Sequence, residues 1–162
     1  MKHLLFAFLF CIPVFQSFSQ ASNNSINITN EENKTTTLSA EDMAAMPHTS
    51  IEVKAHDGNT HSYSGILLMD VLKKAGVKMG DSAKKNVASS YVLITATDKY
   101  KAVYALAETD TLQSNKTIIL ADKTDGKPLP QNALPYQIIA TGEKIHARMI
   151  RQVASIEVKR AM

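Results

Sequence analysis

Residues 91–110 read YVLITATDKYKAVYALAETD. On each side of the polar segment Asp98-Lys99-Tyr100, larger apolar residues recur with a period of two, which predicts two β-strands joined by a short turn. Apolar residues occupy both sets of alternating positions, so we expect at least the first strand to be central in its sheet. The turn therefore places an acid, a base and a phenol at the end of a buried sheet, where binding groups are often held.

Length and composition indicate a single globular domain. The chain has 162 residues, of which 44% are apolar and 20% are charged, and its formal net charge is +3. The basic residues are scattered along the chain, and aromatic residues make up only 6% of it. We therefore expect no nucleic-acid partner, whereas a small anionic ligand is compatible with this weak positive charge.

Residues 1–19 have the pattern of a secretory signal peptide. A short polar start is followed by an apolar run over residues 4–14, and Ser17 and Ser19 precede the expected cleavage point before Gln20. The run is shorter than the roughly 20 apolar residues of a spanning helix. We therefore expect a secreted or periplasmic protein with no membrane span.

Cys11 is the only cysteine in the chain, and it lies inside the predicted signal peptide. Cleavage would leave a mature chain without any thiol, which excludes disulfides, thiolate nucleophiles and cysteine-ligated metals. A lipid-modified Cys11 is the alternative, but Phe10 stands where such a cysteine needs a small residue.

The remaining chain divides into a lead and a domain. Residues 20–37 are rich in Asn, Ser, Thr and Glu, which predicts a flexible N-terminal lead, and residues 38–160 are expected to form the single domain. Helices are expected over residues 39–46 and 65–76, a hairpin over 50–64, and strands over 118–121, 136–140 and 153–158. Helices and strands do not alternate regularly, so we predict an α+β fold with a mixed β-sheet and a few short helices.

Several short motifs follow one another in a recognisable order. They are YSGILLMDVL (63–72), AGV (75–77), DKY (98–100), AE (107–108), DGKPL (125–129), Pro135 and RMIRQV (148–153). Together they resemble the oxidoreductase molybdopterin-binding domain family, which has the sulfite-oxidase-type fold, and most of all its small, secreted, single-domain bacterial members. The resemblance covers residues 38–159 and implies that fold.

The resemblance also implies molybdopterin as a possible cofactor. In the larger enzymes of the family a protein cysteine ligates molybdenum or tungsten on a pterin dithiolene, and basic side chains hold the pterin phosphate. This chain lacks a cysteine after the signal, has Lys99 in place of the usual glycine of Asp-Gly-Tyr, and has Gln137 where an arginine often follows the matched proline. Because function belongs to sites and not to folds, these departures bear on the chemistry more than on the fold.

Five residues are candidates for binding a cofactor or a small anion: Asp98, Lys99, Tyr100, Arg148 and Arg151. The two arginines are three residues apart, so a helical turn would place both guanidinium groups on one face, which suits a phosphate or carboxylate. Structural interpretations stay open, because Asp98 can fix its own turn and an arginine can form an ion pair with Glu108. No catalytic residue and no metal ligand is assigned.

Two histidines flank the turn Asp57-Gly58-Asn59 of the expected hairpin. His56 and His61 could face each other across it as a partial metal site, or could simply be exposed hairpin residues. No third ligand is assigned from the sequence.

Three functions remain in competition. The first is a secreted module that binds a small ligand or docks on a redox partner, without a thiolate metal ligand of its own. The second is a molybdenum-cofactor oxidoreductase, or a subunit of one, in which an oxygen ligand such as Asp98 replaces the thiolate. The third is a structural periplasmic domain without a ligand.

Overall fold

The computed structural model describes residues 24–55, 57–80 and 83–161, so the predicted signal peptide, Cys11 and His56 lie outside the described residues. The strands are β1 (Ile26–Thr29), β2 (Thr35–Leu38), β3 (His48–Lys54), β4 (Thr60–Leu67), β5 (Ser90–Ala96), β6 (Lys101–Ala105), β7 (Ile118–Thr124), β8 (Lys127–Pro128), β9 (Gln137–Ala140) and β10 (Val153–Arg160). The helices are α1 (Ala40–Ala44), α2 (Leu68–Lys74) and α3 (Lys84–Ala88), with 3₁₀ helices η2 (Leu106–Thr109) and η3 (His146–Arg148). No described helix is long and apolar enough to cross a membrane.

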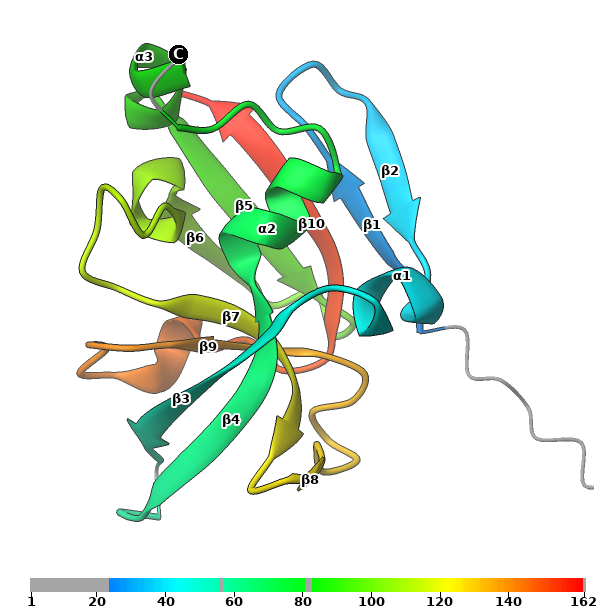
Figure 1. The fold of residues 1–162 in the computed structure, drawn as a ribbon, viewed down its shortest axis with the longest axis vertical. Coiled ribbons are helices and arrows are strands. Elements are labelled where there is room, and N and C mark those ends of the chain that lie inside the picture. The colour runs from blue at the N-terminus through cyan, green and yellow to red at the C-terminus, as the bar shows by residue number, and fades with distance from the viewer. Residues whose placement is uncertain (1–23, 56, 81–82, 162) are drawn as a thin grey trace, which may run out of the picture.

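The strands form two sheets, which lie in the upper and lower parts of Figure 1. Sheet A has the order β2-β1-β10-β5-β6, and sheet B has the order β3-β4-β7-β8, with β9 also paired to β7. The β1–β10 pair is parallel and the other pairs are antiparallel, so sheet A is mixed. The predicted α+β class with a few short helices is confirmed, with two sheets in place of one.

The 91–110 stretch forms two adjacent strands of sheet A, as the period of two predicts, with β6 at the edge of the sheet. Strand β5 lies between β10 and β6, and alternate residues of β5 are buried, so the strand is central. The predicted second strand is too long at its end, because β6 stops at Ala105 and η2 follows. There Thr109 Oγ1 donates a hydrogen bond to the Leu106 carbonyl, which stabilises a helical turn in place of an extended chain.

The flexible lead predicted over residues 20–37 is wrong from Ile26 onward. Strands β1 and β2 form a hairpin there, and β1 pairs with the C-terminal strand β10. Ile26 and Ile28 are completely buried in the main core. Two isoleucines at alternate positions therefore hold this polar segment in the fold.

The helix predicted over residues 65–76 begins only at Leu68, because Gly65, Ile66 and Leu67 continue β4. Gly65 lies against β7, where a Cβ atom would come within 2.2 Å of the Leu120 carbonyl oxygen. The β4–β7 register also shifts between Ser64 and Gly65, which marks an irregularity at this close approach. The predicted end is correct, since Gly76 has a φ of 88°.

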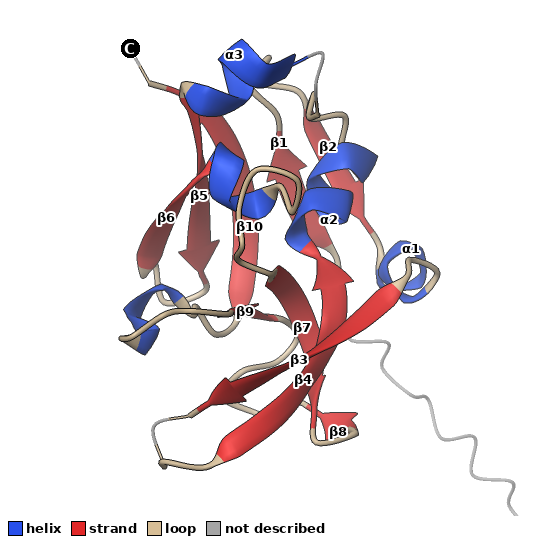
Figure 2. Cartoon of the chain, turned by 60° about the vertical axis from the view of Figure 1, so that its left-hand side comes forward, coloured by secondary structure: helices blue, strands red, loops and turns tan. Residues whose placement is uncertain are grey.

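Helix α2 covers the inner face of sheet A (Figure 2). Its buried residues Leu68, Val71 and Leu72 belong to the same core cluster as Ile94 of β5 and Ile156 of β10. Sheet B has a second, smaller cluster made of Ile119, Ala121, Ile139 and Met149, with Ile51, Val53, Tyr63 and Leu67 packed against it. This second cluster carries the cavity described next.

Candidate functional site

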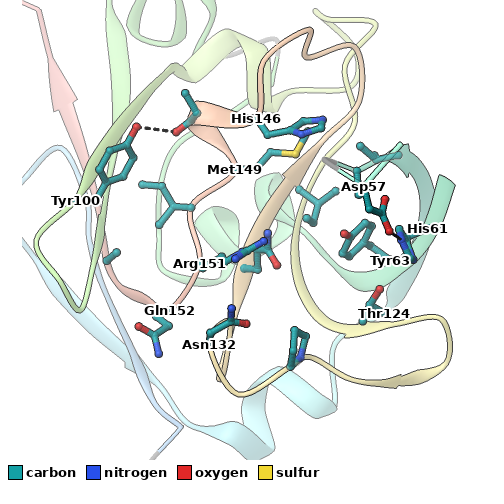
Figure 3. A pocket seen from close by; sticks show the side chains of 18 of the residues that line it. Asp57, His61, Tyr63, Tyr100, Thr124, Asn132, His146, Met149, Arg151 and Gln152 are labelled. Carbon is teal, nitrogen blue, oxygen red and sulfur yellow. Dashed lines mark hydrogen bonds and ion pairs between the residues drawn. The ribbon is translucent and has the colours of Figure 1, made fainter. Parts of the chain in front are cut away.

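A cavity of about 800 Å³, the sheet B pocket, opens beside the second core cluster. Its walls come from the β3–β4 hairpin, the β7–β8 turn, the turn between β5 and β6, and the segment from η3 to β10 (Figure 3). The volume lies within the range of small-molecule sites, which is about 300–1,000 Å³. Segments far apart in the sequence therefore meet around a space that can hold a small organic ligand.

The turn between β5 and β6 places two of the predicted residues, Asp98 and Tyr100, on the pocket wall. Asp98 Oδ1 accepts a hydrogen bond of 2.9 Å from the Tyr100 backbone N–H, which is the turn-fixing role considered for it. The Tyr100 hydroxyl donates to the Ala147 carbonyl at 3.0 Å and so ties this turn to η3. Lys99 does not line the pocket, and its φ of 71° is a left-handed conformation that glycine adopts more easily.

Arg151 also lines the pocket, and its side chain lies among the labelled wall residues of Figure 3. The next residue, Gln152, has a φ of 51°; its N–H donates to the Ala133 carbonyl and its carbonyl accepts from Thr97 N–H. These bonds fix the backbone that carries Arg151. With the described residues, the exposed Arg151 side chain forms no hydrogen bond or ion pair.

Arg148 does not line the pocket, so the shared arginine face predicted from the sequence does not form. The 3₁₀ helix ends at Arg148, Met149 has a φ of -81° and a ψ of 74°, and Gln152 is left-handed, so a spacing of three no longer corresponds to a helical turn that would place both side chains on one face. Arg148 instead joins Glu108, Glu143 and Lys116 in what we call the arginine cluster. Its guanidinium also lies 4.3 Å from the centre of the Tyr104 ring.

The electrostatics of the arginine cluster are those of a structural ion-pair network. Burial tends to raise the pKa of Glu143, but hydrogen bonds from Arg148 and Lys116 outweigh it and hold that pKa below its ordinary value. The pKa of Glu108 is lowered for the same reasons, and the pKa of Arg148 is raised because both carboxylates outweigh burial. The ion pair of Glu108 with an arginine, left open by the sequence, is therefore present.

His61 is held between two carboxylates in the pocket wall. Its Nε2 atom is 3.0 Å from Asp57 Oδ2, and its Nδ1 atom is 2.6 Å from Asp125 Oδ2. Across the hairpin His61 pairs with Val53, whereas His56, which the sequence offers as a possible partner of His61, lies outside the described residues. In the sequence, Asp57 is a residue of the expected hairpin turn and Asp125 appears only in the motif DGKPL. Because 64 positions separate His61 from Asp125, their contact could not be predicted.

Apolar side chains form much of the remaining wall. Val53, Tyr63, Ile139 and Met149 line the pocket and belong to the second core cluster or pack against it. Burial raises the pKa of Tyr63, and the nearby charge of Arg151 partly offsets that rise. A ligand in this space would meet an apolar surface next to a guanidinium group.

The donor groups of the pocket fit an anionic organic molecule better than a metal centre. Arg151 and Lys54 are exposed cations in the lining and suit a phosphate or carboxylate. The chain's single cysteine is Cys11, so no thiolate reaches the pocket from residues 24–161. Among the described residues, no group of three His, Cys, Asp or Glu side chains has the arrangement of a metal site. Binding of a cofactor by Asp98, Tyr100 and Arg151 stays a prediction.

Comparisons with known proteins agree with the fold. No curated protein sequence matches the chain. The crystal structure of the sulfane dehydrogenase SoxCD from Paracoccus pantotrophus is similar, with a TM-score of 0.63 and 14% sequence identity. The match covers 83% of this chain but only 38% of that one, and at this identity it shows the fold alone. The family model described as the oxidoreductase molybdopterin binding domain matches residues 13–162, and the chain therefore belongs to that family.

Proposed function

We propose that this protein is a small-ligand-binding module of the molybdopterin-binding domain family, whose sheet B pocket takes an organic anion without a thiolate metal ligand. The observation that carries the proposal is the exposed Arg151 guanidinium in a cavity of about 800 Å³, with no hydrogen-bond or ion-pair partner among the described residues. The contrast with Arg148, three residues earlier, is informative. Two carboxylates neutralise Arg148, whereas Arg151 keeps its charge for a ligand.

The chemical class of the ligand follows from the two kinds of wall. A guanidinium group offers paired N–H donors that match a carboxylate, phosphate or sulfonate. Val53, Tyr63, Ile139 and Met149 offer an apolar surface on which a flat or aliphatic body can be buried. We therefore expect an acid group on an apolar or aromatic body, and this class includes but is not limited to a pterin phosphate.

The test compares two exposed arginines in a binding experiment. Benzenesulfonate is the probe, since its charge does not change near neutral pH, and isothermal titration calorimetry measures its affinity. Arg151→Gln should weaken binding by about 30-fold, because a hydrogen-bonded charge contributes about 2 kcal/mol and each 1.4 kcal/mol is a factor of ten. Arg160→Gln is the control, because Arg160 is also exposed but does not line the pocket. Equal affinities for the two variants would refute the assignment of Arg151.

The alternative function is a molybdenum-cofactor oxidoreductase with a non-cysteine ligand. The observation in its favour is that Asp98, the proposed oxygen ligand, lines the same pocket as Arg151. Metal and organic analysis of protein purified natively from its own host separates the two functions. Stoichiometric molybdenum or tungsten with a pterin supports the enzyme, and it should then be lost in Asp98→Ala. A metal-free protein that carries another organic acid supports the binding module.

We further propose that the protein acts outside the cytoplasm, where it serves a periplasmic redox partner or a small anionic ligand. The signal pattern of residues 1–19 supports export. Cell fractionation tests it, and N-terminal sequencing of the exported protein should begin at Gln20. Recovery of an uncleaved protein from the cytoplasm would contradict it.

A further inference from the structure

Asp57, His61 and Asp125, here called the His61 clamp, join two turns of the sheet B pocket. Asp57 belongs to the turn between β3 and β4, and Asp125 belongs to the turn between β7 and β8. All three side chains line the pocket, and Figure 3 shows the Asp57–His61 contact beside Tyr63. Because one imidazole ring contacts both carboxylates, it connects the two turns through its own two nitrogens.

The geometry demands a particular protonation state. A neutral imidazole has one N–H donor and one acceptor nitrogen, whereas an ionised carboxylate only accepts. Distances of 3.0 Å and 2.6 Å to two carboxylates therefore require a donor on each ring nitrogen. Loss of one proton would leave a ring lone pair facing a carboxylate oxygen, and that contact would break.

We infer that His61, in its doubly protonated form, is a positioning residue that holds the β3–β4 turn in the pocket wall, and that loss of one proton releases this turn and weakens ligand binding. The part about binding rests on the proposed function, whereas the part about the turn does not.

The contacts indicate which turn is released. Asp125 is held independently of His61, because its Oδ1 accepts from Ser62 N–H at 3.0 Å and its own N–H donates to the Ser62 carbonyl at 2.7 Å. Within residues 24–55, 57–80 and 83–161, the other side-chain hydrogen bonds of Asp57 are with Asn59 of the same turn. A neutral His61 that keeps its shorter bond to Asp125 would therefore remove the one side-chain hydrogen bond that links Asp57, among the described residues, to His61 and through it to the β7–β8 turn.

Other ionisable groups lie around His61 and its two carboxylate partners. The Tyr63 ring lies 6.5 Å away in a T-shaped arrangement, Arg151 acts on Tyr63, and Lys127 acts on Asp125. The hydrogen bonds to Asp125 and then to Asp57 raise the pKa of His61, despite some desolvation. In return, the hydrogen bond from His61 and those from Asn59 lower the pKa of Asp57 to about 2.

The signs of these shifts define the pH range of the clamp. The stabilisation of the clamp by protonated His61 is complete below the ordinary histidine pKa of about 6.5. It is lost as pH rises through the raised pKa of His61 in the folded protein. The stabilisation of the clamp by ionised Asp57 and Asp125 is complete above the ordinary aspartate pKa. It is lost as pH falls through the lowered pKa values of these two residues. The clamp is therefore complete between about pH 4 and pH 6.5 and opens above that range.

The first experiment follows the clamp without any ligand. In full-length protein labelled with ¹⁵N, the imidazole signals of His61 give its pKa, and hydrogen exchange of the amides of residues 57–59 reports the order of the turn. We expect both nitrogens of His61 to be protonated at pH 6. Once His61 loses a proton, the amides of residues 57–59 should exchange faster than the intrinsic pH dependence of amide exchange predicts. A His61 pKa at or below about 6.5 would overturn the inference, and so would amide exchange in residues 57–59 that does not change as His61 titrates.

The second experiment adds benzenesulfonate, whose charge is constant across the range. We expect affinity to fall about tenfold as His61 loses its proton, and linkage then requires the pKa of His61 to rise by about one unit when the pocket is saturated. His61→Gln should abolish this pH dependence, whereas His48→Gln should keep it. His48 is a matched control because it also contacts a carboxylate, Asp122 at 3.1 Å, but lies outside the pocket lining.

The outcomes separate the two proposals. Benzenesulfonate could bind equally well to both protonation states of His61 while His61 titrates with the expected raised pKa. That result would overturn only the part of the inference that concerns ligand binding. Absence of benzenesulfonate binding at every pH would contradict the proposed function and the part of the inference that rests on it. The titration of His61 and the exchange of residues 57–59 would still decide whether the clamp holds the turn.

Discussion

Replacement of Arg148 and Arg151 by methionine, one at a time, distinguishes a structural arginine from a binding one. Arg148 donates to Glu108, to Glu143 and to the Val103 carbonyl, and its guanidinium lies over the Tyr104 ring. Arg151 makes no such contact with the described residues. We therefore expect Arg148→Met to lower the free energy of unfolding and Arg151→Met to leave it unchanged within about 0.5 kcal/mol.

The magnitude follows from the burial of the arginine cluster. The side chain of Glu143 is 10% exposed and that of Arg148 is 30% exposed, so the pair lies between a buried and a surface ion pair. Breaking a buried pair costs about 3–5 kcal/mol and an exposed pair at most about 1 kcal/mol. Lys116, which lies 3.0 Å from Glu143 in the wild-type protein, can still pair with that carboxylate in the variant and should reduce the loss. We expect Arg148→Met to cost about 2 kcal/mol, including the contact with the Tyr104 ring.

Urea unfolding at several pH values measures this difference. With a typical slope of about 2 kcal/mol per molar urea, the midpoint of Arg148→Met should fall by about 1 M at pH 7. The pKa values of Glu108 and Glu143 are lowered in the folded protein, so their stabilisation is present above the ordinary pKa and is lost as pH falls through the lowered values. The difference between wild type and Arg148→Met should therefore shrink towards pH 3. Equal urea midpoints for the two methionine variants would refute the reasoning. A difference between wild type and Arg148→Met that stays constant with pH would refute it as well.

Two further variants test other parts of the fold. Ile28→Ala should lower the free energy of unfolding in urea by about 3 kcal/mol, because Ile28 is completely buried. Lys34→Ala in the exposed β1–β2 turn is the control and should leave it unchanged. An Ile28→Ala variant as stable as wild type would contradict the place of β1 in the core. Lys99→Gly should raise stability by up to about 1 kcal/mol, since Lys99 has a φ of 71°, and thermal unfolding that shows a loss would contradict a strained turn.

Local patterns of the sequence predicted the elements whose signals are local. The period of two around residues 98–100 predicts β5 and β6, and the helix predicted over residues 39–46 is present as α1, with a capping box formed by Ser39 and Asp42 at its start. The β1 strand was missed because its partner β10 lies 128 positions away, as in the pair Asn27–Ser155. Only two isoleucines mark β1 within a polar stretch, and their burial depends on that distant strand.

The start of α2 shows how a distant contact can override a local pattern. Ile66 fits the helical spacing of the apolar residues that follow it, but Gly65 lies so close to Leu120 of β7 that the chain there is a strand. The approach of β7, and not the local propensity, decides this boundary. Neither the stripe nor the glycine alone contains that information.

The candidate site was half predictable for a related reason. Asp98 and Tyr100 lie in a turn that the sequence predicts, and Arg151 lines the same pocket, but binding by these residues stays a prediction. Arg148 was assigned to the same site on the assumption of a helical turn, but η3 ends at that residue. The His61 clamp could not be predicted, because the β4–β7 pairing brings Asp125 to His61 across 64 positions.

The distribution of charge in the pocket explains why an acid is the expected ligand even though carboxylates are present. Asp57, Asp98 and Asp125 each accept hydrogen bonds from the protein, from Asn59, Tyr100 and Ser62 respectively, and two of them share His61. Their negative charge is thus spread over fixed donors, whereas Arg151 has no such partner among the described residues. Protonation of His61 leaves the clamp with one net negative charge in place of two, so an incoming anion is repelled less at the pH where the turn is held. Affinity for an acid and order of the β3–β4 turn should therefore fall together as pH rises, which a pocket for a cation would not show.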